Sequence, residues 1–140
     1  MNYLLDTCAI SELVKKKPNP GLIRWIDSCD EQSLFLSVIT LGELQKGFSK
    51  LSDEDRVKQL EAWVDGDLSQ RFANRILPID QEVMQIWGRL QGESEKRGVK
   101  LPIMDSLIAA TAVVRQLVVV TRNVTDLERC QALVHNPWEG

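Results

Sequence analysis

Short apolar runs alternate along this chain with longer stretches of helical periodicity, and this alternation constrains the fold more than any other feature. The run Leu117–Val120 has no alternating polar positions, which is typical of a strand that is buried on both faces. The segment Ile103–Arg115 has almost no polar face, so we expect a helix that is buried on most sides. Strands that alternate with helices predict an α/β fold with a mostly parallel sheet.

The same patterns give an expected position for each element. We expect strands at residues 3–5, 34–38, 76–79, 117–120 and 133–134. The third of these should lie at an edge of the sheet, because Pro78 cannot donate a hydrogen bond to a neighbouring strand. Helices are expected at residues 11–17, 22–26, 39–51, 52–68, 80–98, 103–115 and 126–131. We find no repeat, low-complexity tract or linker, and residues 1–140 should form a single domain.

Composition and cysteine content argue against several classes of protein. No segment has the length and apolar character of a membrane span, and residues 1–6 lack the pattern of a signal peptide. The cysteines Cys8, Cys29 and Cys130 are widely spaced, which argues against a disulfide framework or a zinc site and favours the reducing cytoplasm. A net charge of −3 counts mildly against nucleic-acid binding, but carboxylates that hold a divalent ion also make a chain acidic.

Four carboxylates are candidates for a functional site, although each has a plainer explanation. Asp6 and Asp126 each follow an expected strand, so both should lie at the carboxyl edge of the sheet, yet both are also typical of helix caps or turns. Glu43 only borders the inward stripe of its helix, and periodicity leaves its role open. Asp105 lies in an apolar setting that requires a helix N-terminus, a cation or a metal as compensation, and a cap is again the alternative.

Together these acids indicate a metal site, because several of them can converge at one end of a parallel sheet. Three or four carboxylates cannot stay ionised side by side in a low dielectric without large pKa shifts, and a hard divalent cation removes that penalty. Oxygen ligands favour Mg²⁺, with Mn²⁺ as a substitute, and no clustered His or Cys competes for a softer metal. Such a site suits phosphodiester hydrolysis by a metal-activated water, and a second ion about 3.5–4 Å away could stabilise the leaving oxygen.

Four segments in a fixed order resemble the motif set of a known family. The segments are Leu4–Thr7, Ser37–Gly47, Met104–Ala112 and Val120–Asp126, and Asn136–Trp138 comes near the end of the chain. In these segments the sequence resembles PIN-domain proteins, and specifically the VapC-type toxins of type II bacterial toxin–antitoxin modules, with the ending of the FitB-like branch. The resemblance extends over nearly the whole chain, and four motifs in order are a specific signal where any one alone is weak.

The resemblance implies a three-layer α/β/α fold with a mostly parallel central sheet of about five strands. It also implies a Mg²⁺-dependent endoribonuclease that forms a homodimer and is inhibited by a cognate, DNA-binding antitoxin. By motif position the expected catalytic acids are Asp6, Glu43, Asp105 and Asp126. The ion should bind Asp6 and Asp105 directly and the other two acids through water. The expected supporting polar groups are Thr7, Thr121 and Asn123.

Several other residues are candidates for a part in binding or catalysis. The candidates for contacts with RNA phosphates are Lys46, Arg75 and Arg122. The basic run Lys15–Lys17 is more typical of a solvated helix end than of a phosphate site. Cys8 has no base close to it in sequence, which favours a small buried residue over a nucleophile, and the motif set does not need His135 as a general base.

Two other functions stay open from the sequence alone. Asp6 after a strand could be the nucleophile of an aspartyl-phosphate phosphatase, but Asp6-Thr7-Cys8 lacks the second aspartate that such enzymes use two residues later. The chain could also be a catalytically weak binding module that acts with a DNA-binding antitoxin on operator DNA. Cleavage of RNA with Mg²⁺, compared with EDTA and with Asp105→Asn, discriminates between the enzyme and the binding module.

Overall fold

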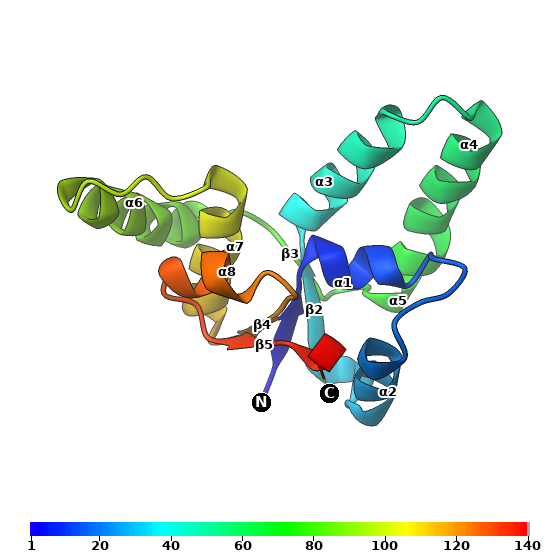
Figure 1. Ribbon diagram of the computed structural model, residues 1–140, viewed down its shortest axis with the longest axis horizontal. Helices are drawn as coiled ribbons and strands as arrows, with labels where there is room; N and C mark the ends of the chain where they lie inside the picture. The colour runs from blue at the N-terminus through cyan, green and yellow to red at the C-terminus, as the bar shows by residue number, and fades with distance from the viewer. Residues whose placement is uncertain (140) are drawn as a thin grey trace.

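The strands form one parallel sheet in the order β3-β2-β1-β4-β5, in a computed structural model that describes residues 1–139 (Figure 1). In chain order the strands are β1 (Tyr3–Leu5), β2 (Leu34–Ser37), β3 (Ile76–Leu77), β4 (Val118–Val120) and β5 (Val134–His135). The predicted α/β class is confirmed, and the strand before Pro78 lies at an edge as expected. Gly140, the predicted end of the domain, lies outside the described residues.

The sheet is covered on both faces, because successive side chains of its inner strands point to opposite sides. Leu4 and Val119 belong to one hydrophobic core, whereas their neighbours Leu5 and Val120 belong to the other. All of these side chains are at most 1% exposed. A strand that is buried on both faces needs apolar residues at every position, which explains the continuous apolar runs in the sequence.

The helices form two layers, one against each core. One layer contains α6 (Gln81–Lys96), α7 (Ile103–Arg115) and α8 (Val124–Arg129). The other contains α1 (Thr7–Glu12), α2 (Pro20–Ser28), α3 (Val38–Ser49), α4 (Glu54–Trp63) and α5 (Ser69–Arg71). Short 3₁₀ turns lie at Glu31–Ser33 and Pro137–Glu139. Figure 1 shows the layers on opposite sides of the sheet, which confirms the three-layer arrangement. Among the helices of residues 1–139, none has both the length and the apolar character to cross a membrane.

Most helices differ from their predicted bounds by one or two residues at an end, and two differ by more for local reasons. The first begins at Thr7 rather than at residue 11, because the Asp6 carboxylate accepts the backbone N–H of Ala9 and caps it. The helix expected over 52–68 is capped by Asp53 and ends at Trp63, where a π-helical turn over Val64–Leu68 takes over. In contrast, α7 has the predicted bounds.

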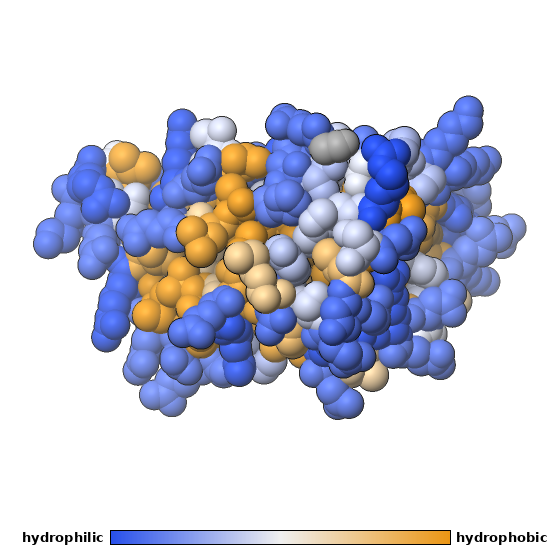
Figure 2. Space-filling model, turned by 90° about the horizontal axis from the view of Figure 1, so that it is seen from below, coloured by the Kyte–Doolittle hydropathy of each residue, from blue (hydrophilic) through white to orange (hydrophobic). Residues whose placement is uncertain are grey.

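One face of the molecule carries exposed apolar side chains. Figure 2 shows them gathered over part of the surface that is seen from below, where the N-terminus also lies in Figure 1. A groove there is lined by apolar groups that include Met1, Val113 and Leu133, which are 89%, 43% and 72% exposed. Apolar patches on a soluble surface are typical of contacts with another protein.

Arg75 is a structural residue, which corrects its predicted contact with RNA. Its guanidinium donates to the carbonyl oxygens of Leu34 at 2.6 Å, of Glu31 and of Arg71. It also pairs with the Glu31 carboxylate at 3.2 Å, and its side chain is only 8% exposed. The guanidinium therefore ties β2 to the segment that leads into β3 and is not available to a phosphate.

Replacement of this buried cation should destabilise the fold. We expect Arg75→Met to lower the free energy of unfolding by about 2–4 kcal/mol, because it leaves buried carbonyl groups without donors. The matched control is Arg71→Met, whose ion pair with Glu31 is 37% exposed on the arginine side and should contribute less than about 1 kcal/mol. Urea unfolding measures both variants, and equal losses would contradict this role for Arg75.

Candidate active site

The predicted acids lie on elements that begin at the carboxyl edge of the sheet. Asp6 directly follows β1, and Glu43 lies in the second turn of α3, which directly follows β2. Asp126 lies in the first turn of α8, just after β4. Asp105 lies in the first turn of α7, whose other end leads into β4, so this first turn returns to the same edge. The topology therefore brings together acids that are far apart in the sequence.

Asp6 is a buried carboxylate that caps α1 and also faces the other acids. Its Oδ1 accepts the Cys8 thiol at 2.8 Å and the backbone N–H of Ala9 at 3.1 Å. Burial raises the pKa of Asp6, and hydrogen bonds from Cys8, the Thr121 hydroxyl and backbone N–H groups partly offset that rise. The cap and the site are thus not alternatives here, because a single carboxylate does both.

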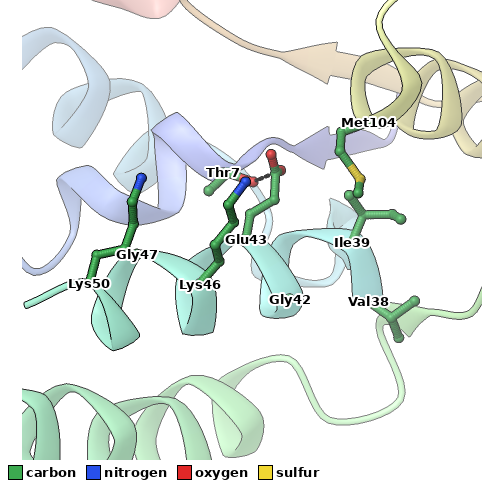
Figure 3. Close-up of a pocket in the computed structure, with 9 residues that line it drawn as sticks. All are labelled: Thr7, Val38, Ile39, Gly42, Glu43, Lys46, Gly47, Lys50 and Met104. Carbon is green, nitrogen blue, oxygen red and sulfur yellow. Dashed lines mark hydrogen bonds between the residues drawn. The ribbon is translucent and has the colours of Figure 1, made fainter.

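Glu43 is held in place by a hydroxyl from the neighbouring helix. Thr7 Oγ1 donates to Glu43 Oε1 and lies 3.4 Å from the hydroxyl of Thr40. Figure 3 shows this contact between α1 and α3, with the carboxylate turned toward α1. Thr7 was expected as a supporting group, and the structure places it against an acid that periodicity alone left ambiguous.

Asp105 is half-buried, and three neighbouring acids act on it. Burial raises the pKa of Asp105, and the negative charges of Asp126, Glu43 and Asp6 raise it further. It is not a helix cap, because α7 begins at Ile103 after Pro102 and has no side-chain cap. The alternative explanation of Asp105 as a cap is therefore wrong.

The start of α7 is instead fixed by the residue that follows Asp105. Ser106 is fully buried, and its hydroxyl accepts Trp87 Nε1 and Gln91 Nε2, each at 2.9 Å. The same hydroxyl donates to the carbonyl oxygen of Ile103. These contacts tie the first turn of α7 to α6, and because Asp105 lies in that turn, they also fix its position at the edge of the sheet. Ser106 was not among the residues predicted from the sequence, although a polar residue in an apolar stretch was an available signal.

The loop after β4 supplies the remaining predicted polar groups. Thr121 is fully buried, accepts the backbone N–H of Asn123 at 2.8 Å and lies 3.9 Å from the sulfur of Cys8. Asn123 is exposed at the N-terminus of α8, where its side chain makes no cap. Thr121 is thus in a position to orient Asp6, while no hydrogen bond joins the Asn123 side chain to Asp6 or Glu43 within residues 1–139.

Cys8 connects two of these segments and was not recognised as part of the site. Its sulfur donates to Asp6 and accepts the backbone N–H of Arg122 at 3.4 Å, so it joins α1 to the loop after β4. Burial, followed by the charge of Asp6, raises the pKa of the Cys8 thiol to about 12. A thiol with such a pKa is protonated at neutral pH, which agrees with a hydrogen-bond donor and not with a nucleophile.

The side chain of Arg122 leaves this loop on its exposed side. Its guanidinium carbon lies over the ring of Trp138, 5.6 Å from the ring centroid, and the residue as a whole is exposed. A cation that rests on an aromatic face keeps its charge and its donors accessible. The expected contact of Arg122 with RNA phosphates therefore stays a prediction.

The charges of three acids act on Asp105, but the four acids do not form a finished ligand shell. Within residues 1–139, no three His, Cys, Asp or Glu side chains are arranged to hold an ion. In the same residues none of the four acids has a lysine or arginine at ion-pair distance. Carboxylates supported by hydroxyl groups suit a hard divalent cation, and the side chains would have to draw together around it.

Comparison with known proteins agrees with this geometry. The PIN domain family matches residues 3–130, which is most of the chain. This chain belongs to the PIN-domain family. "Toxin FitB" of Neisseria gonorrhoeae (strain ATCC 700825 / FA 1090) is 33% identical over 135 residues, covering 96% of this chain and 97% of its own. "VapC ribonuclease Y4jK" of Sinorhizobium fredii (strain NBRC 101917 / NGR234) is 32% identical over 136 residues, covering 97% of each chain. The resemblance found in the motifs is therefore confirmed.

Solved structures have the same PIN fold. The crystal structure of FitAcB from Neisseria gonorrhoeae matches with a TM-score of 0.91 and 33% identity, covering 99% of each chain. The structure of FitAB bound to the IR36 DNA fragment matches with a TM-score of 0.88 and 32% identity, covering 97% of this chain and 95% of that one. Likeness over nearly whole chains confirms the PIN fold around the acids.

The reactivity of Cys8 should report its contact with Asp6. A rise in thiol pKa from 9.0 to about 12 lowers the thiolate fraction about a thousandfold, so alkylation of Cys8 by iodoacetamide should be slow. Asp6→Asn removes the neighbouring charge and should accelerate the reaction, as read by mass spectrometry of the Cys8 peptide. Cys29 is the internal control, and an unchanged rate at Cys8 in the variant would count against the contact.

Removal of one acid should stabilise the metal-free protein at neutral pH. The raised pKa of Asp105 means that its ionised form opposes folding, and this effect disappears as the pH falls through the raised pKa toward the ordinary value of 3.8. Asp105→Asn should therefore unfold at a higher temperature than the parent at pH 7.5 without divalent ions. The difference should shrink toward pH 4. A variant that is less stable at pH 7.5 would contradict the repulsion.

Proposed function

We propose that this PIN-domain chain is a Mg²⁺-dependent endoribonuclease toxin of a toxin–antitoxin module, acting in the cytoplasm as one domain over residues 1–140. The observation that carries the proposal is the set of unpaired carboxylates at the carboxyl edge of the sheet, whose charges raise the pKa of Asp105. Relatives over nearly the whole length are named as a toxin and as a ribonuclease, which supports the same activity here. A metal-dependent nuclease is the function that such an acid set serves best.

Each residue of the candidate site has a defined role in the proposed reaction. Asp6 and Asp105 would hold the metal, and Glu43 and Asp126 would contribute to the same negative field. Thr7 holds the Glu43 carboxylate, while the Cys8 thiol and the Ala9 N–H orient the Asp6 carboxylate through its Oδ1. When bound, Mg²⁺ supplies an activated water and neutralises charge on the phosphoryl group.

The proposed antitoxin should present positive charge to this site. Four acids without a basic partner form a surface that a cationic side chain can neutralise, and arginine does so with two parallel hydrogen bonds. A DNA-binding antitoxin is supported by the similar FitAB structure, which is bound to a DNA fragment. The apolar groove beside Met1, Val113 and Leu133 is a candidate surface for the proposed homodimer.

The alternative of a catalytically weak binding module that acts with a DNA-binding antitoxin on operator DNA is less well supported. DNA-binding surfaces are basic, whereas the carboxyl edge of this sheet gathers negative charge and the whole chain has a net charge of −3. Placement of four acids together with hydroxyl and thiol donors also has no role in phosphate contacts. The enzyme therefore accounts for the site, and contact with DNA belongs to the partner.

Activity of the purified chain, free of any partner, tests the proposal. We expect cleavage of RNA with Mg²⁺ and none with excess EDTA, and Asp6→Asn or Asp105→Asn should lower kcat by about 10²–10³-fold, because the charge that holds the ion is lost. The matched control is Asp53→Asn, which removes the charge of an exposed carboxylate at the N-cap of α4, outside the candidate site, and should retain activity. Cleavage that survives EDTA and both site variants would refute a metal-dependent nuclease.

A further inference from the structure

A groove beside the acids extends along α3 and is lined by more than carboxylates. It has a volume of about 570 Å³ and runs past Thr7 and Glu43 to a basic end, with Met104 on its other side (Figure 3). Residues of α1, α3 and α7 therefore form a single channel that opens directly onto the candidate active site. A channel that begins at the reacting group is where the rest of a polymeric substrate must lie.

The basic end of this groove consists of Lys46 and Lys50. Lys46 lies in the last turn of α3, and Lys50, four residues later, is the C-cap residue and keeps a right-handed helical backbone, so both lie on the face of Glu43. Figure 3 shows both ammonium groups turned to the same side of α3 as the Glu43 carboxylate. Both side chains are exposed, and within residues 1–139 neither has a carboxylate at ion-pair distance. Two exposed lysines that lack an acidic partner in the described part of the chain lie beside the candidate active site and are in a position to bind an anionic ligand.

The spacing of these lysines suits consecutive phosphates. Four residues of α-helix rise by about 6 Å, which is close to the step between neighbouring phosphates along an extended nucleic-acid strand. Glu43 precedes Lys46 by one turn, and Lys50 caps the end of α3, so the acid and the two lysines follow one another along the helix and its C-cap. A strand whose scissile phosphate lies at the acids would place its next phosphates over the lysines.

The walls of the groove suit a single strand of nucleic acid. Side chains are absent at Gly42 and Gly47, and a Cβ atom built at either position would meet nothing within 4 Å. At the other end Ile39 and Met104 form an apolar wall, and Met104 is 48% exposed. An exposed apolar wall can pack against an unstacked base, which a single strand offers and a duplex does not.

We propose that Lys46 and Lys50 bind two consecutive phosphates of a single-stranded RNA segment, on one side of the bond that is cut. We call the two lysines Lys46 and Lys50 the phosphate track. This track rests on the proposed nuclease function, because the acids at its start define the scissile phosphate. It assigns Lys50 a role in substrate binding and gives Lys46 a specific partner, the phosphate next to the scissile one.

Equilibrium binding separates the track from the chemistry. Fluorescence anisotropy with a labelled, unstructured RNA is measured on the cleavage-deficient Asp105→Asn protein and on the same protein with Lys46→Ala, Lys50→Ala or both. We expect a loss of affinity of about five- to tenfold for each lysine, and a slope of log affinity against log salt that is shallower by about 0.7 for each phosphate contact removed. Lys96→Ala, at the exposed end of α6, is the matched control and should change neither quantity.

Occlusion of the groove provides a second variant that does not depend on charge. Gly47→Leu fills open space on α3, and because leucine favours helix more than glycine, the melting temperature should stay the same or rise. RNA affinity should fall about tenfold. Gly92→Leu on α6 is equally unobstructed and should leave binding unchanged.

The outcomes distinguish the track from the proposed activity. Unchanged RNA affinity and salt slope in the double lysine variant overturn the track, even if the parent cleaves RNA. The track is also overturned if the lysine changes weaken only the binding of an acidic peptide, because the groove would then serve a protein partner. If RNA binding falls as expected but the parent chain does not cleave RNA, the phosphate contacts of the two lysines stand, whereas the nuclease proposal and the position of a scissile bond beside them fail.

Discussion

Repulsion between carboxylates at the carboxyl edge of a parallel sheet is the constraint on which this molecule is organised. Asp126, Glu43 and Asp6 all raise the pKa of Asp105, because the folded chain holds these like charges close together, whereas in the unfolded chain they lie apart in water. The stability that opposes this repulsion comes from elsewhere, namely from two apolar cores that cover both faces of the sheet. Electrostatic repulsion at the site and the stabilising apolar contacts in the layers thus lie in different parts of the fold.

Three of the four acids are placed by a neighbour that has no charge of its own. Thr7 holds Glu43, the Cys8 thiol holds Asp6, and the buried hydroxyl of Ser106 fixes the turn that carries Asp105. Neutral donors orient a carboxylate without cancelling its charge, whereas a lysine or arginine would neutralise the site and compete with a metal. The basic groups near the site are Lys46, in the last turn of α3, and Lys50, at its C-cap, and within residues 1–139 neither is at ion-pair distance from the acids.

The sequence alone predicted the architecture well, because strand and helix patterns are local. The continuous apolar run Leu117–Val120 is a consequence of burial on both faces of the sheet, and both it and the apolar helix Ile103–Arg115 appear where they were expected. The helix is less buried than predicted, because Ile103, Met104 and Val113 are 54%, 48% and 43% exposed. The roles of Arg75 and Cys8 could not be predicted in the same way. Arg75 pairs with carbonyl oxygens some 40 residues away, at Leu34 and Glu31, and Cys8 meets a loop at Arg122, so only the folded chain shows their partners. Motif order identified the acids as candidates, but their mutual electrostatics depends on the topology.

The position of a bound divalent ion shows most directly whether the four acids share a metal. Crystals of the protein grown with Mn²⁺, measured at the manganese absorption edge, give an anomalous signal that locates the ion without regard to any assumed site. We predict a peak at ligand distance from carboxylate oxygens of Asp6 and Asp105, with Glu43 and Asp126 in the surrounding shell. A fully occupied ion elsewhere in the molecule, with these four carboxylates left apart, would contradict a shared metal site.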